Sequence, residues 1–270
     1  MRNSPGFQQG RRGETGFTLI EALVTVAVLV VVLGVAFSYA GRLQRVYKAE
    51  ETKVDATQEA RTFFDGIQRE LHQAGFPGRK MYGPGVLITP ANNDQRNAVG
   101  LVMVSSSELL FEADIDNDSR VESVRYTLMD SAGNPVTAAS TCPCTLQRSQ
   151  VLKVNGSPPM AQPTSYASAL DGVINSGGVG AGGGALTISG SSPVGSNDTV
   201  YAAYKTPQLF TAFDQNGAVV PGTNLNSNPT AIASIRSIAI NINLLTTFMD
   251  TQTKMRPALS MSTTVKLNNF

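Results

Sequence analysis

The sequence predicts an α+β protein, in which one long N-terminal α-helix with a transmembrane first half packs on an antiparallel β-sheet domain. Three observations predict this class. Residues 22–41 carry no charge, and a run of that length suits a membrane-spanning helix. Residues 60–71 space their apolar side chains as an amphipathic helix does. The remaining chain alternates short apolar runs with turn residues, which is typical of β-strands.

Composition limits the classes of function. The chain has 270 residues, a formal net charge of +1 and only 15% charged residues, with no basic stripe of the kind that binds nucleic acid. His72 is the only histidine, so no Ser-His-Asp or Cys-His arrangement is indicated. We therefore expect no enzyme and no specific nucleic-acid partner.

The first residues admit three interpretations. Residues 1–16 are polar and rich in arginine and glycine, and an apolar run follows them. The segment could be an uncleaved anchor, or a Sec signal peptide cut after Ala40 in Ser38-Tyr39-Ala40. It could also be a leader that is removed between Gly16 and Phe17. An ordinary signal-peptide core is about 7–15 residues long, and this run is longer, which weakens the Sec interpretation.

Glu21 is the one acid in this apolar segment. A carboxylate within a membrane-spanning helix costs on the order of 3 kcal/mol, so it usually has a partner and a role. If the chain is cut after Gly16, the new amine of Phe17 is the natural partner of Glu21 in a neighbouring subunit. Such a pair is strongly favoured in the low dielectric of a helical bundle.

The predicted helix covers residues 17–75 and has two parts. Residues 17–41 are apolar all round, and the later residues are apolar on one face only. Glycine and proline at 75–78 end the helix. A β-rich domain follows over residues 76–270, in which the glycine-rich stretch 156–195 is predicted to be a long surface loop. The predicted strands are 98–104, 108–113, 121–129, 145–154, 185–189, 199–204, 209–213, 218–220, 232–245 and 259–267.

An acidic stretch begins like a calcium-binding loop. Asp114, Asp116 and Asp118 follow the D-x-D-x-D pattern, and with Glu122 they would supply the ligands. Ser119 stands where such a loop has glycine, and Arg125 where it has a bidentate glutamate. These two departures favour the alternative, a solvated hairpin turn rich in Asp and Asn.

Cys142 and Cys144 form a C-x-C motif around Pro143. In an oxidising compartment the pair could close a small disulfide ring, or it could stay reduced. The single histidine lies far away in the sequence, which argues against a metal site. A local structural role is the expectation.

Gly16-Phe17-Thr18-Leu19-Ile20-Glu21 resembles the cleavage and methylation motif of type IV prepilins. Three further stretches are similar to PilW-type minor pilins, or to the related pseudopilins of type II secretion. They are the end of the predicted helix at 67–76, the acidic hairpin at 113–126 and the C-terminal strand at 259–269. Asn268 stands where members of this group have arginine. The resemblance implies a pilin-like fold.

The resemblance also implies how the protein is processed and assembled. A prepilin peptidase would remove residues 1–16 and methylate the amine of Phe17, and Glu21 would guide methylation and assembly. The protein would wait in the bacterial inner membrane, surrounded by lipid, with its β domain in the periplasm. The inner-membrane assembly platform would then move it into a pilus at the cell surface, where helices 17–37 of major and minor pilins form the core. Twitching motility, cell adhesion and DNA uptake all stay open as roles of the fibre.

One alternative belongs to another class. Cleavage after Ala40 would release a secreted β-rich binding protein, which would depend on calcium if the acidic loop binds it. The sequence therefore predicts a non-enzymatic pilus subunit first, a pseudopilin second and a secreted binding protein third.

Overall fold

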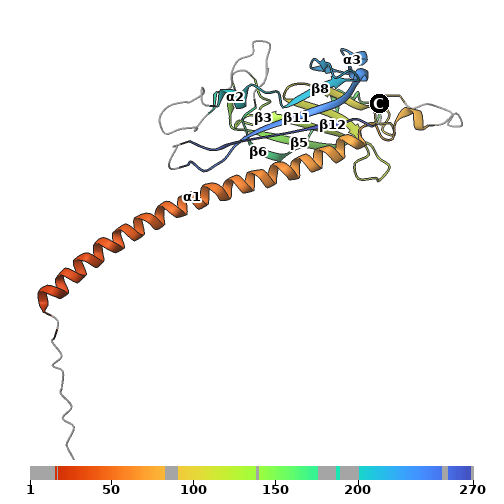
Figure 1. The fold of residues 1–270 in the computed structure, drawn as a ribbon. Coiled ribbons are helices and arrows are strands. Elements are labelled where there is room, and N and C mark those ends of the chain that lie inside the picture. Colours follow the sequence, from red (N-terminus) through yellow and green to blue (C-terminus); the bar gives the residue numbers. More distant parts are fainter. Residues whose placement is uncertain are drawn as a thin grey trace, which may run out of the picture. The chain divides into compact units, whose positions relative to one another are not determined.

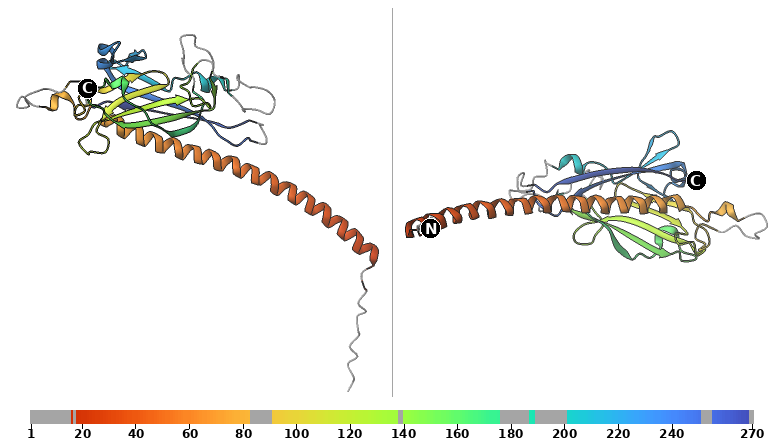
Figure 2. Two further views of the ribbon diagram at one scale, coloured as in Figure 1. Left: turned by 180° about the vertical axis from the view of Figure 1, so that it is seen from behind. Right: turned by 60° about the horizontal axis from the view of Figure 1, so that its bottom comes forward.

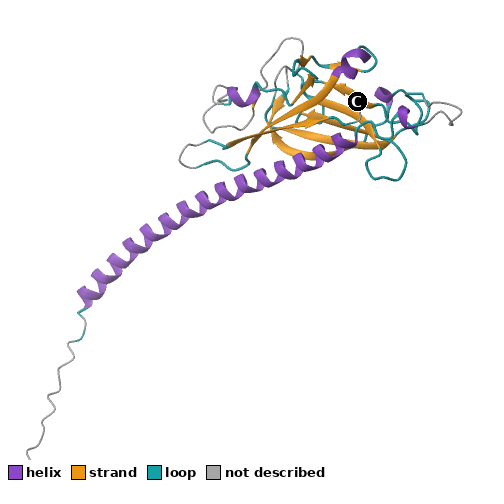
Figure 3. Cartoon of the chain, turned by 45° about the vertical axis from the view of Figure 1, so that its right-hand side comes forward, coloured by secondary structure: helices purple, strands orange, loops and turns teal. Residues whose placement is uncertain are grey.

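The computed structural model describes residues 16, 18–82, 91–137, 140–175, 187–188, 201–250 and 255–268. Two compact units make up the chain, Met1–Tyr47 and Lys48–Phe270. The helix α1, Leu19–Gln73, contributes to both units and is continuous (Figure 1, Figure 3). The strands all follow it, so the α+β, pilin-like architecture predicted from the sequence is confirmed.

Helix α1 is long because nothing in its sequence stops it. No proline occurs between Pro5 and Pro77, and the glycines inside the helix each cost only up to about 1 kcal/mol against alanine. The helix ends before Gly75, which has a φ of +82°, a left-handed conformation that favours glycine. The backbone N–H of Gly75 donates to the carbonyl of Glu112, 2.9 Å away, which joins the helix end to the sheet.

In the second unit, one face of α1 packs on the sheet. The apolar stripe predicted from the sequence is buried, and it consists of Ala60, Phe63, Phe64, Ile67 and Leu71. The ring of Phe63 meets that of Tyr126 edge-on, with centroids 5.8 Å apart. Figure 2 shows this end of α1 lying along the strands. Burial of such a stripe is what stabilises most protein helices.

Polar side chains fix the position of the same helical turns. The Nε2 of Gln68 donates to the hydroxyl of Thr263, 2.5 Å away. The carboxylate of Glu70 accepts bonds from the Tyr126 hydroxyl and from the Arg148 guanidinium, both at 2.7 Å. These contacts tie α1 to three strands.

The domain is built on one antiparallel sheet of ten strands in the order β10-β1-β2-β3-β5-β6-β11-β8-β9, with β12 paired to β11. Its strands are β1 Gly100–Val104, β2 Glu108–Ala113, β3 Glu122–Met129, β5 Cys144–Leu152, β6 Tyr166–Val173, β8 Phe210–Asp214, β9 Val219–Val220, β10 Thr223–Asn224, β11 Ile235–Leu245 and β12 Ala258–Lys266. A separate parallel pair joins β4 Thr141–Cys142 to β7 Thr187–Ile188.

Strand β11 organises the C-terminal part of this sheet. It pairs with β12 from Ser237 to Leu245, and the opposite edge pairs with β8 and then with β6. Its isoleucines at 238, 240 and 242 are fully buried, as the period of two in the sequence predicts. Short helical segments connect the strands: η1 Arg79–Met81, η2 Pro159–Ala161, α2 Ala202–Lys205 and α3 Pro229–Ser234.

The loop predicted at 156–195 is wrong over part of its length, because Tyr166–Val173 form β6 between β5 and β11. Glycine and serine hid this strand in the sequence. Gly172 has a φ of +76°, and a Cβ there would lie 2.9 Å from the carbonyl oxygen of Leu245. The glycine thus permits a close approach of two strands rather than a loop. Residues 176–186 and 189–195 lie outside the described residues.

The strand predicted at 199–204 is also wrong over its described part. Ala202–Lys205 form the helical turn α2, in which the N–H of Lys205 donates to the carbonyl of Tyr201, 3.0 Å away. Tyr201 is buried, and its hydroxyl donates to the carbonyl of Arg256. The aromatic residue that suggested a strand instead anchors a helical turn.

Candidate functional site

The start of α1 is the first candidate site. Gly16 and Thr18 are described, exposed and outside regular structure, whereas Phe17 and residues 1–15 lie outside the described residues. The predicted cleavage site between Gly16 and Phe17 thus falls immediately before α1, which begins at Leu19.

Thr18 caps the helix, and this feature was missed in the sequence. Its carbonyl accepts bonds from the N–H groups of Glu21 and Ala22, each at 3.1 Å, and its hydroxyl lies 3.4 Å from the N–H of Glu21. Thr18 and Glu21 have the S/T-x-x-E spacing of a capping box, which could have revealed the cap. The cap places Glu21 in the first helical turn, where the helix dipole favours a carboxylate.

The helix surface beyond Glu21 is apolar and uncovered by the chain itself. Residues 19–40 are exposed at every position, with Leu29 at 57%, Val35 at 67% and Phe37 at 73%. An 18-residue window of α1 reaches a mean hydropathy of 2.8 with none of it buried, so by length and composition α1 can cross a membrane. Such a surface is stable only against lipid or other apolar helices.

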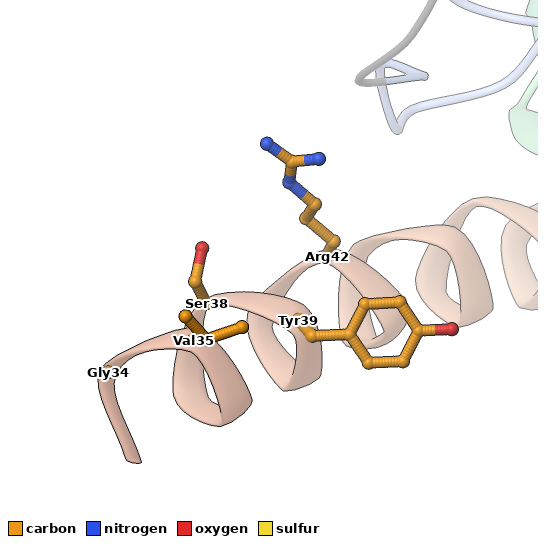
Figure 4. A pocket seen from close by; sticks show the side chains of 5 residues that line it. All are labelled: Gly34, Val35, Ser38, Tyr39 and Arg42. Carbon is orange, nitrogen blue, oxygen red and sulfur yellow. The ribbon is translucent and has the colours of Figure 1, made fainter. Parts of the chain in front are cut away.

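A shallow hollow of about 360 Å³ lies on the helix where this apolar run ends. It is lined by Gly34, Val35, Ser38, Tyr39 and Arg42. Figure 4 shows these residues following one another along α1, with Tyr39 and Arg42 extending outward at one end. Small residues four positions apart, as at Gly34 and Ser38, allow another helix backbone to come close.

A comparison with known protein families matches this region. The family described as "Prokaryotic N-terminal methylation motif" matches residues 11–37, which contain Gly16, Glu21 and most of the apolar run. The match is consistent with the N-terminus of a type IV prepilin-like protein. The motif implies processing by a prepilin peptidase, pilin-type interactions and a membrane anchor. No curated protein matches the chain.

The acidic loop joins β2 to β3. The structure brings together three of the four predicted ligands, because oxygens of Asp114, Asp116 and Glu122 all lie within 4.8 Å of one another. Asp118 is not in this cluster, and its carboxylate accepts the N–H of Arg120 at 2.8 Å.

Two features of the loop backbone explain why the cluster forms. Asn117 and Ser119 have φ angles of +62° and +70°, a left-handed conformation that curls the chain. Ser119 thereby takes the conformation that glycine takes in calcium loops.

The pKa of Glu122 reflects its place in this cluster. Burial raises the pKa of Glu122, and the nearby aspartates raise it further. A backbone hydrogen bond from Ile115 lowers it.

The structure joins Cys142 and Cys144 in a disulfide bond. Both residues are buried in the main core, at 0% and 1% exposed. Cys142 ends β4 and Cys144 begins β5, so the bridge lies between the small parallel pair and the large sheet. Its buried position agrees with the structural role predicted for the pair.

A buried ion pair beside the acidic loop was not foreseen. Lys153 Nζ lies 2.5 Å from Glu112 Oε2, and both side chains are 0% exposed. Lys153 also donates to the carbonyls of Asn92 and Asn97, at 2.6 and 2.7 Å. Burial raises the pKa of Glu112, and the adjacent ammonium of Lys153 opposes this. The only signal in the sequence was an acid within the apolar run 108–113.

Proposed function

We propose that this protein is a minor pilin of the PilW type, a structural and assembly-priming subunit of a type IV pilus. It is cut after Gly16, methylated on Phe17 and held in the inner membrane with its β domain in the periplasm. It then enters the fibre through its N-terminal helix. One observation carries the proposal: Glu21 of the methylation motif stands in the first turn of a helix whose next nineteen residues carry no charge and are exposed.

The charge of Glu21 accounts for assembly. Cleavage leaves a cationic amine at Phe17, and the N-terminus of a helix is already positive. Four helical residues span roughly 6 Å, so a neighbour displaced by about that distance along the axis sets its amine level with Glu21. In an apolar bundle each unpaired charge is costly, and pairing between subunits therefore favours assembly.

The finer assignment to the PilW type rests on three stretches that resemble this group. The stretch 67–76 ends α1 on the sheet, 113–126 forms the β2–β3 hairpin and 259–269 covers most of β12. Each stretch thus belongs to the second unit, where it supports one packed helix–sheet arrangement. The same features suit a pseudopilin of type II secretion, which is the second candidate.

A structural role is proposed rather than an enzymatic one. The charged contacts of Glu70 and Lys153 serve packing. A secreted form cut after Ala40 has less support, because α1 continues without a break from Leu19 to Gln73. Exposed loop segments, rather than helices, are the preferred sites of proteolysis.

The proposal is tested by comparing Glu21→Val with Thr25→Val in the native host. Thr25 lies one turn further along, and its hydroxyl bonds only to backbone carbonyls of Glu21 and Ala22. Each variant is followed by immunoblot in sheared surface fibres and in membranes, with the N-terminal peptide mass measured in both. We expect Glu21→Val to be cleaved after Gly16 and to stay in the membrane, while Thr25→Val enters fibres. Fibres that contain normal amounts of Glu21→Val would contradict the charge-pair mechanism.

Deletion of the chain separates the pilus from the secretion system. Loss of surface fibres with normal protein secretion is the result expected for a pilin. Normal fibres with blocked secretion would assign the protein to the second candidate, the pseudopilin.

A further inference from the structure

The turn between β2 and β3 has the dimensions of a single-cation site. Oxygens of Asp114, Asp116 and Glu122 lie within 4.8 Å of one another. Two oxygens bound to the same calcium ion at about 2.3–2.6 Å are at most about 5 Å apart. The three carboxylates therefore already have a spacing that one calcium ion can bridge.

Asp114 supplies an independent sign of a missing ligand. It is 4% exposed, and its Oδ2 accepts the N–H of Ser119 at 3.0 Å. Its Oδ1 is buried and has no hydrogen-bond partner among the described residues. Buried polar atoms in proteins nearly always have a partner, so this carboxylate oxygen points to a bound group that completes it.

In two other aspartate turns of the same domain, the protein itself supplies the hydrogen-bond donors to the carboxylate. Asp130 and Asp214 each accept two backbone N–H bonds from their own turns, at 2.8–3.0 Å. These backbone bonds lower the pKa of both carboxyls. Both carboxylates are thus satisfied by the protein alone. The turn at Asp114 differs because it buries its aspartate and leaves one oxygen without a donor.

The charge of the turn also lacks a protein counterion. The ion pairs of the described residues do not include Asp114, Asp116 or Glu122. Arg120 belongs to the same turn, but it is exposed and makes no ion pair with them in the described structure. Three neighbouring carboxylates repel one another unless a cation lies between them.

We propose that Asp114, Asp116 and Glu122 bind one calcium ion. Their ligands are all carboxylate oxygens, which are the ligands that hard cations prefer. Magnesium demands near-ideal octahedral geometry and usually keeps several waters with only one or two carboxylates, whereas this cluster offers three carboxylates. Calcium is the better match.

The ion would stabilise the place where α1 ends. The N–H of Asp114 donates to the carbonyl of Phe76 at 2.8 Å, directly after α1. Calcium would hold the turn that carries this contact. The site lies in the β domain, so the inference is independent of the function proposed for the N-terminal helix.

The test uses the mature full-length protein, purified in detergent and treated with EDTA. Calcium chloride and magnesium chloride are titrated by calorimetry, and Tm is measured with each salt and with EDTA. The variants are Asp116→Asn, Glu122→Gln and the control Asp214→Asn. Asp116 and Asp214 are not buried, so these substitutions leave the core intact.

We expect one calcium ion per chain with a Kd of about 10⁻⁴–10⁻³ M, the range of extracellular modules. Saturating calcium should raise Tm by about 3–5 °C. Asp116→Asn and Glu122→Gln should weaken binding by about tenfold or more, and Asp214→Asn should bind as the wild type does. Absence of binding with an unchanged Tm would overturn the proposal. So would magnesium binding as tight as calcium binding, or equal affinities in Asp116→Asn and Asp214→Asn.

Discussion

Helix α1 has two stretches that are stabilised in opposite ways. Residues 19–47 are exposed at every position except Gly41, although most of them are apolar. Residues 48–73 are charged and polar on most faces, but five apolar side chains are buried against the sheet. The first stretch needs lipid or neighbouring helices, and the second is satisfied by its own chain. One continuous helix thus carries an exposed apolar surface and an internal packing surface.

The largest expected difference between the stretches comes from truncating one apolar residue in each. Ile67→Ala should lower the free energy of unfolding by about 2–5 kcal/mol, because Ile67 is 0% exposed and leaves a cavity. Leu29→Ala should change it by less than about 0.5 kcal/mol, because Leu29 is 57% exposed. Denaturant unfolding in detergent measures both. Equal effects of the two substitutions would contradict the conclusion that only the second stretch is stabilised by packing within the chain.

Polar contacts should show a smaller contrast in the same direction. Glu70→Ala leaves the buried Tyr126 hydroxyl without its acceptor and should cost about 1–3 kcal/mol. Glu51→Ala removes a surface pair with Lys48, in which both side chains are more than half exposed, and should have no measurable effect. Thermal unfolding of both variants makes the comparison. A null result for Glu70→Ala would mean that packing alone holds the second stretch.

The smallest effect is expected at alkaline pH, where the stability of the packed second stretch should depend on Tyr126. Burial raises the pKa of Tyr126 far above its ordinary value of 10.0, and the neighbouring Glu70 raises it further. Above pH 10 the unfolded chain therefore releases this proton while the folded chain keeps it, so stability falls as pH rises. The loss reaches about 1.4 kcal/mol by about pH 11. Tyr126→Phe should lack this component, and urea unfolding at about pH 9 and pH 11 measures it. Parallel pH dependence in both proteins would contradict the burial of this hydroxyl.

The sequence predicted the features that depend on a regular pattern. The apolar run, the stripe ending at Leu71 and the alternating isoleucines of β11 each follow the period of a helix or a strand. The hexapeptide from Gly16 to Glu21 identified the N-terminus through a motif. In these cases the local residues determine the structure.

Strand β6 and the buried Lys153 were missed because they depend on partners distant in the sequence, whereas the missed Thr18 cap is local. Strand β6 exists because it pairs with β5 and β11, and its glycine accommodates the backbone of Leu245. Lys153 is buried only because Glu112, Asn92 and Asn97 surround its ammonium. The acidic loop combines the two cases. Its D-x-D-x-D pattern was visible in the sequence, but only the fold shows that Asp118 lies apart from the other three carboxylates. Tertiary pairing of this kind leaves no periodic pattern in the local sequence.

We expect α1 to remain on a mature protein that begins at Phe17. The mass of the N-terminal peptide, measured on protein from its native membrane, tests it most directly. The expected result is a first residue of N-methylated Phe17, followed by Thr18. A mature chain that begins at Gly41, or one that still carries residues 1–16, would contradict it.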